Sequence, residues 1–82
     1  MSVKNKYLCV RAEVDAHNKL KNVSCKMYDT FDKAGVVMDT KYMKDLESDG
    51  VRKSGLFQEG GVIIFNNGSR ILCRVVPIKF AL

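Results

Sequence analysis

The tripeptide at 66–68, Asn-Asn-Gly, constrains the fold of this 82-residue chain more than any other feature. It separates two apolar runs, 61–65 and 69–76. Asn-Gly between apolar runs is the strongest short-range signal of a β-hairpin, because both residues tolerate the positive φ angles of a tight type I′ turn. We therefore predict a hairpin with a two-residue turn and with Gly68 at positive φ.

A two-residue turn also predicts which side chains share a face of this hairpin. One face would hold Phe65, Arg70 and Arg74 together with Ile63 and Leu72. An aromatic ring beside guanidinium groups can stack on a base while the cations bind phosphates. The alternative is an ordinary sheet face, because Ile63 and Leu72 are too apolar to remain in water and would be covered by a helix or a second subunit.

A second pair of alternating segments lies near the N-terminus. Residues 6–14 alternate between apolar and mixed positions, and residues 22–28 repeat the alternation after a polar connection at 15–21. A period of two with one apolar face predicts strands against a core, so these segments should form a first hairpin. At the other end Pro77 lacks a backbone donor, which predicts that the last strand ends there or becomes an edge.

One short helix is expected between the two hairpins. Asp39 has the position of a helix N-cap and Gly50 that of a C-terminal stop, so we predict a helix over 40–48. Residues 29–35 fit a single turn or a loop, and 36–38 a short strand. The whole chain is therefore predicted to be one small α+β domain, an antiparallel sheet from two β-hairpins with one short helix between them in sequence.

Charge is sorted along the chain. Residues 1–28 carry six Lys/Arg and two acids, residues 29–49 carry three Lys and six acids, and residues 50–82 carry five Lys/Arg and one acid. If both basic ends meet in one sheet, the protein has a positive face with an acidic element beside it. Such a field attracts polyanions and accelerates their association.

The basic face predicts a nucleic-acid interface. No RNA-binding signature motif and no basic helix suited to a DNA major groove is present, and aromatics on strands favour RNA over DNA. The same lysines could serve only solubility, or block edge-to-edge association of strands. The candidate binding residues are Lys4, Lys6, Lys19, Lys21, Lys26, Arg52, Lys53, Phe65, Arg70 and Arg74.

The acidic segment offers a different hypothesis. Asp45, Glu47 and Asp49 lie at the end of the predicted helix, where negative charge opposes the helix dipole. This patch could dock on a basic host enzyme, which would make the chain a protein-only inhibitor or adaptor. A solvated surface is the ordinary explanation for such a cluster.

No set of residues predicts catalysis. The chain has one His and three Cys, and the cysteine spacing matches neither a metal site nor a disulfide framework. The carboxylates of the acidic segment are expected in solvent, where they do not acquire catalytic pKa values. We expect a non-enzymatic cytoplasmic protein without cofactor or metal. No membrane association is expected, because no apolar run approaches the roughly 20 residues that span a bilayer.

In its size, odd cysteine count and lack of a catalytic set, the chain is similar to phage-encoded early accessory proteins. Some of these inhibit host defence nucleases, including ribonuclease toxins of toxin–antitoxin systems. The similarity is one of overall character across the chain, and no motif carries it. It implies a protein of the host cytoplasm that binds a toxin–RNA assembly and silences the nuclease.

A homodimer is also expected. The apolar tail at 75–82 and the side chains of Ile63 and Leu72 exceed what one short helix can cover. Chains of this size bury a modest fraction of their surface and are only marginally stable alone. The predicted interface is a sheet edge or the apolar tail.

Overall fold

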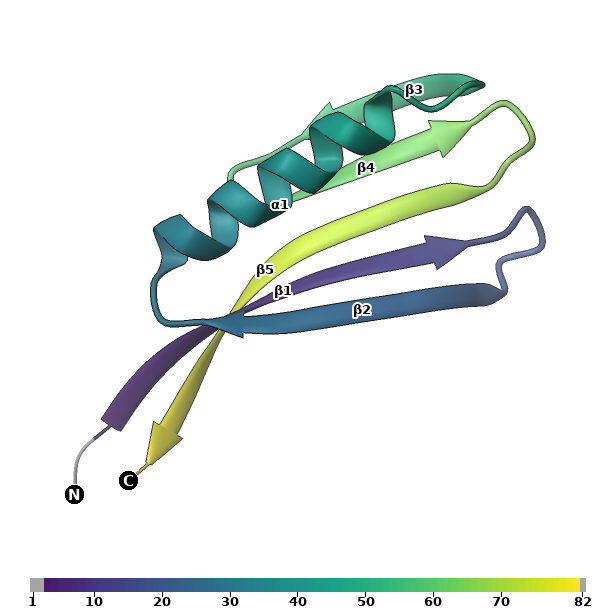
Figure 1. Ribbon diagram of the computed structural model, residues 1–82. Helices are drawn as coiled ribbons and strands as arrows, with labels where there is room; N and C mark the ends of the chain where they lie inside the picture. The colour runs from purple at the N-terminus through teal and green to yellow at the C-terminus, as the bar shows by residue number, and fades with distance from the viewer. Residues whose placement is uncertain (1–2, 82) are drawn as a thin grey trace.

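One helix packs on one face of a five-stranded antiparallel sheet in the computed structural model, which describes residues 3–81 (Figure 1). The strands lie in the order β2-β1-β5-β4-β3, and the helix lies between β2 and β3 in sequence. This arrangement confirms the expected α+β fold. The elements are β1 (Val3–Val14), β2 (Leu20–Tyr28), α1 (Phe31–Leu46), β3 (Val51–Leu56), β4 (Gly60–Phe65) and β5 (Arg70–Ala81).

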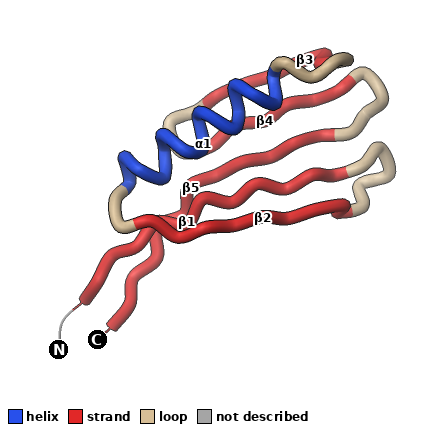
Figure 2. Tube along the Cα trace, in the orientation of Figure 1, coloured by secondary structure: helices blue, strands red, loops and turns tan. Residues whose placement is uncertain are grey.

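The two long strands β1 and β5 form the centre of the sheet. They pair from Val3 with Ala81 to Val14 with Arg70, and beyond the ends of β2 and β4 they continue as a two-stranded arm (Figure 2). On the β4 side of β5, the Val75 amide donates to the Glu59 carbonyl at 2.8 Å. Because alternate residues of a strand direct their amides to the same side, the nitrogen of Pro77 points to this side after β4 has ended. The strand thus becomes an edge at Pro77, as predicted.

Helix α1 begins earlier than its sequence indicates. The Thr30 side chain accepts a hydrogen bond from the Lys33 amide at 3.1 Å, so Thr30 and not Asp39 is the N-cap. The predictions of a helix limited to 40–48, of a turn or loop at 29–35 and of a strand at 36–38 were therefore wrong. Tertiary packing overrides the weak helix propensity of the Gly-Val-Val segment at 35–37.

The core lies between α1 and the sheet. Ala34, Met38 and Tyr42 are spaced four residues apart on one side of the helix and are buried, Ala34 completely. Met38 packs over the Cys9 and Val75 region of the central strands, and Tyr42 packs in a second cluster with Ile63 and Ile71. Through these two buried clusters, the helix packs on β1, β5 and β4 at the same time.

Gly61 allows the helix to approach the sheet this closely. A Cβ atom at this position would lie 2.9 Å from Cε2 of the Tyr42 ring and 3.1 Å from Cδ1 of Leu56. The ring of Tyr42 therefore occupies the space above the Gly61 backbone. Any larger residue on β4 at this point would push the C-terminal half of α1 away from the sheet.

The β4–β5 turn has three residues and not two. The Phe65 amide donates to the Ser69 carbonyl at 2.9 Å, and the Gly68 amide donates to the Phe65 carbonyl at 3.0 Å. Gly68 has the expected positive φ, 91°. A three-residue loop with glycine in the left-handed conformation is the next most common hairpin connection after the two-residue turn.

This extra residue moves the pairing register by one position and exchanges the faces of β5 relative to β4. Ile63 pairs with Ile71 and Ile64 pairs with Arg70. Phe65 consequently lies on the helix side of the sheet, whereas Arg74 lies on the opposite side. The prediction that Phe65 shares a strand face with Arg70 and Arg74 was therefore wrong, because both arginines lie on the side opposite the helix.

We predict opposite effects of alanine at two glycines. Gly68→Ala places a side chain at positive φ and should lower the free energy of unfolding by roughly 1 kcal/mol. Gly35→Ala should raise it by about 0.5–1 kcal/mol, because Gly35 lies inside α1 and a Cβ there meets no atom within 4 Å. Urea denaturation measures both. Equal stability of Gly68→Ala and wild type would contradict the turn geometry.

Candidate nucleic-acid interface

Helix α1 covers only part of its side of the sheet. It contacts β1, β5, β2 and β4, and it runs obliquely from the base of β2 toward β3 and β4 (Figure 1). The helix side of β1 and β2 is therefore left open near the β1–β2 turn. The side chains on this open part are polar, in contrast to the apolar ones beneath the helix.

Arg11 forms the floor of this open part. Its Nε donates to Asp45 Oδ2 at 2.9 Å, and its Nη2 donates to Asp45 Oδ1 at 2.9 Å and to Glu13 Oε1 at 3.1 Å. The hydrogen bond to Asp45 is the main cause of a raised Arg11 pKa. This bidentate ion pair connects the last turn of α1 to β1 and fixes the two elements relative to each other.

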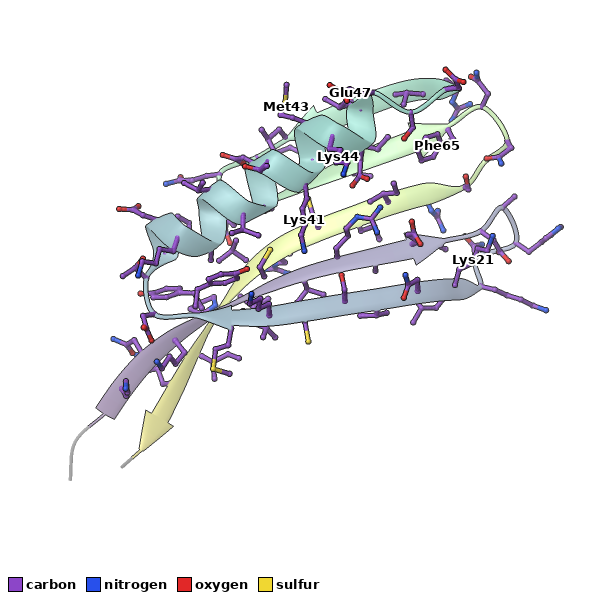
Figure 3. All side chains as sticks on the ribbon, in the orientation of Figure 1. Lys21, Lys41, Met43, Lys44, Glu47 and Phe65 are labelled. Atoms are coloured by element: carbon purple, nitrogen blue, oxygen red, sulfur yellow. The ribbon has the colours of Figure 1, made fainter. Side chains whose placement is uncertain are left out.

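Lysines from α1 and β2 face each other across this floor. Lys41 projects from α1 over the central strands, as Figure 3 shows, and Lys44 follows three residues later on the same flank. Burial raises the pKa of the Cys9 thiol on β1, and the Lys41 ammonium offsets part of that rise. Lys26 is the partner of Cys9 on β2, so Lys26 and Lys41 approach the same point from two sides.

A polar cleft of about 400 Å³ continues the floor toward the β1–β2 and β4–β5 turns. Lys21 and Arg70 line it together with Arg11. Nη2 of Arg70 donates to Asn18 Oδ1 in the β1–β2 turn, whereas its Nε is buried and has no partner within residues 3–81. A buried guanidinium donor without an acceptor costs free energy.

Together these residues form one surface, which we name the basic groove. It carries five cations and two carboxylates, Glu13 and Asp45, a net charge of +3. Phe65 lines the polar cleft at one end, and Tyr28 lies at the other end with its ring centroid 5.8 Å from Lys26 Nζ. The five cations of the basic groove are Arg11, Lys21, Lys26, Lys41 and Lys44.

The structure brings together only part of the residues proposed from sequence. Lys21 and Lys26 lie in the basic groove, with Phe65 at its margin, whereas Arg70 borders the polar cleft from the opposite side of β5. The others are distributed over distant parts of the molecule: Lys4 and Lys6 on the β1–β5 arm, where Lys6 pairs with Asp29, Lys19 in the β1–β2 turn, Arg52 and Lys53 on the edge strand β3, and Arg74 on the opposite sheet face.

Sequence reasoning missed Arg11, Lys41 and Lys44. Lys41 lies seven residues after Ala34 and three after Met38, which places it beside the buried side of a helix that begins at residue 31. Extending the helix to Thr30 would have revealed this flank. Arg11 carried no signal of its own, because its partner Asp45 lies 34 residues away.

The acidic residues proposed as an alternative docking site do not act as one group. Asp45 is largely enclosed, with 18% of its side chain exposed, and both of its oxygens accept hydrogen bonds from Arg11. Glu47 and Asp49 are exposed. A partner that binds the acidic segment would therefore meet these two side chains rather than three.

Comparisons of the chain with protein-family models, with curated proteins and with solved structures found no match. Among residues 3–81, no three His, Cys, Asp or Glu side chains are grouped so that they could hold a metal ion. The same part of the chain contains no helix that is long and apolar enough to cross a membrane. Arguments about function therefore rest on the geometry of the basic groove itself.

The Arg11–Asp45 pair should contribute measurably to stability. Arg11→Leu leaves the Asp45 carboxylate without its main partner, and we expect a loss of roughly 1–3 kcal/mol, between the values for exposed and buried pairs. The double variant Arg11→Leu/Asp45→Leu should recover part of this loss, because it removes the unpaired charge. Urea denaturation of Arg11→Leu, Asp45→Leu and the double variant measures the coupling, and strictly additive losses would contradict it.

Proposed function

We propose that this protein is a non-catalytic nucleic-acid-binding protein that holds single-stranded RNA in the basic groove. The observation that carries the proposal is the convergence of five cations from α1, β1 and β2 on one surface. Neutralising phosphates releases condensed counterions, and this release is the main source of sequence-independent affinity for nucleic acids.

The outer surface of α1 favours a single strand over a duplex. Lys41 and Lys44 lie on the flank that faces the strands, whereas Asp32, Asp39 and Glu47 are exposed on the remaining surface of the helix and its end. A helix with this distribution would repel the phosphates that border a major groove. A single strand can enter the basic groove from the side and place its phosphates on the lysines.

Aromatic side chains at the two ends of the basic groove support this mode of binding. Tyr28 lies beside Lys26, and Phe65 lines the polar cleft beside Arg70. Unpaired bases stack on aromatic side chains, and a cation beside the ring binds the adjoining phosphate. The two rings are partly exposed, so each can offer an edge or a face to a base.

The similarity to phage accessory proteins supplies a setting for this proposal. In that setting the bound RNA belongs to a toxin–RNA assembly, and the protein silences the ribonuclease by holding its RNA. The alternative is a protein-only inhibitor that docks through its acidic residues. That alternative now depends on Glu47 and Asp49, since Asp45 is engaged by Arg11.

Charge reversal in the basic groove should remove RNA binding. We expect Lys26→Glu/Lys41→Glu to weaken binding of a labelled single-stranded RNA by more than about tenfold in fluorescence anisotropy. For wild type, about four neutralised phosphates imply a loss of roughly 50-fold between about 50 and 200 mM salt. A labelled single-stranded DNA of the same sequence measures the preference for RNA.

The matched control is Arg52→Glu/Lys53→Glu, which makes the same change in net charge on β3. We expect its affinity to stay close to that of wild type. Equal losses in both double variants would show that binding follows the total charge and not the basic groove. Absence of binding to any RNA or DNA would refute the function, and loss of partner inhibition in Glu47→Lys/Asp49→Lys alone would favour the protein-only inhibitor.

A further inference from the structure

The sheet face opposite α1 is apolar over β1, β2 and the centre of the sheet, and it carries Lys53, Arg70 and Arg74 on β3 and β5. No element of residues 3–81 covers it. Val23, Met27 and Leu72 are 49%, 44% and 42% exposed, and Phe57 at the β3–β4 turn is 66% exposed. Strand alternation and the observed register place further apolar side chains among them. We name this surface the open face; it comprises Leu8, Val10, Ala12, Val23, Cys25, Met27, Phe57, Val62, Leu72 and Val76.

The two uncovered surfaces of the sheet differ in the polarity of their side chains. On the helix side, the uncovered positions of β1 and β2 are Arg11, Glu13, Ser24 and Lys26, all polar. Their neighbours on the open face are apolar along the same strands. An antiparallel sheet with one solvated face shows polar residues on that face, so the open face has the composition of a surface that is covered.

The middle of the open face is hollowed. A groove of about 560 Å³ is lined by Val10, Ala12, Val62 and Leu72, with Phe57 as one wall. Gly60 lies on its floor opposite Arg74, and a Cβ at Gly60 would come within 2.7 Å of the Cys73 carbonyl oxygen. Large protruding side chains beside a groove of this kind can interdigitate with a similar surface.

We propose that a second copy of this chain packs on the open face, sheet against sheet, to form a homodimer with the two helices on the outside. Two sheets stacked in this way lie about 10 Å apart, and their inner side chains form a common core. The two basic grooves then point away from each other. This interface differs from the sheet edge or apolar tail expected from sequence, and it does not depend on the proposed function.

The size of the open face fits a copy of the chain better than a small ligand. Five strands at about 4.8 Å and roughly seven residues at about 3.3 Å give a flat outline of roughly 550 Å². Protruding side chains raise the accessible area above this outline. Specific interfaces bury about 800 Å² per partner, whereas a ligand filling the groove would leave Val23 and Met27 in water.

The charges of the groove also suit a copy. The chain carries a net charge of +5, so most of its surface repels a second copy. The groove, in contrast, holds one cation, Arg74, and one anion, Glu59. A two-fold interface sets the same patch against itself, so a self-complementary patch must contain both signs.

Light scattering tests the proposal with a matched pair of variants. Wild type at high micromolar concentration should have twice the 9.2 kDa mass of the chain, and Leu72→Glu should have the mass of one chain. Met43→Glu makes the same exchange at a 58% exposed position on α1 and should remain dimeric. A monomeric wild type, or a dimeric Leu72→Glu, would overturn the proposal.

Alkylation of Cys25 gives a second measurement that needs no variant. Cys25 lies on the open face, whereas Cys9 is buried and Cys73 is partly buried, and burial raises the pKa of both of those thiols. In the dimer, iodoacetamide should modify Cys25 slowly at high protein concentration and faster after dilution. Fast modification at every concentration would overturn the interface, even for a chain that dimerises through an edge.

The salt dependence of dimerisation, compared with that of RNA binding, distinguishes this inference from the proposed function. Apolar burial is not weakened by salt, so the dimer should persist at salt concentrations that release RNA from the basic groove. A dimer that dissociates together with the RNA would contradict an apolar interface. A monomer that still binds RNA would overturn the dimer and leave the function standing.

Discussion

The packing of Met38 and Tyr42 against the centre of the sheet is the interaction on which the rest of the structure depends. These two side chains join α1 to the central strands through Val75 and Ile63, which are fully buried. Because the helix lies obliquely, its C-terminal half is fixed over β4 by the space above Gly61. The open part of β1 and β2, and with it the basic groove, is the consequence of that oblique position.

The same packing divides the molecule into surfaces of different chemistry. On the helix side, cations gather where the helix does not reach, and the Arg11–Asp45 pair fixes the boundary between the covered and open parts. On the other side the sheet presents apolar side chains. The helix packs on one side of the sheet, and no element of residues 3–81 covers the other side.

The sequence predicted the fold class and both hairpins because alternation and turn residues are local signals. It misplaced the start of α1, since the Gly-Val-Val segment at 35–37 has weak helix propensity and only its packing on the sheet makes it helical. Lys41 and Lys44 lay inside the predicted helix, but they were missed because Ala34 and Met38, which define the buried side of α1, precede the predicted start. Arg11 and Asp45 are 34 residues apart and come into contact only in the folded chain, so no local pattern predicts their ion pair.

The three-residue turn between β4 and β5 has a consequence for how such a chain can evolve. Surface loops ordinarily accept insertions and deletions, because lengthening them costs little entropy. Here β5 is held in register by β1 on one side and β4 on the other. Losing or gaining one residue between Phe65 and Ser69 would force β5 to slip against one neighbour. The slip would bring the alternate set of β5 residues, Leu72 and Arg74 among them, beneath the helix in place of Ile71 and Val75. The residues of this turn are exposed, and only Gly68 is restricted in type, by its positive φ. The number of residues in the turn is constrained, because it sets the register of β5.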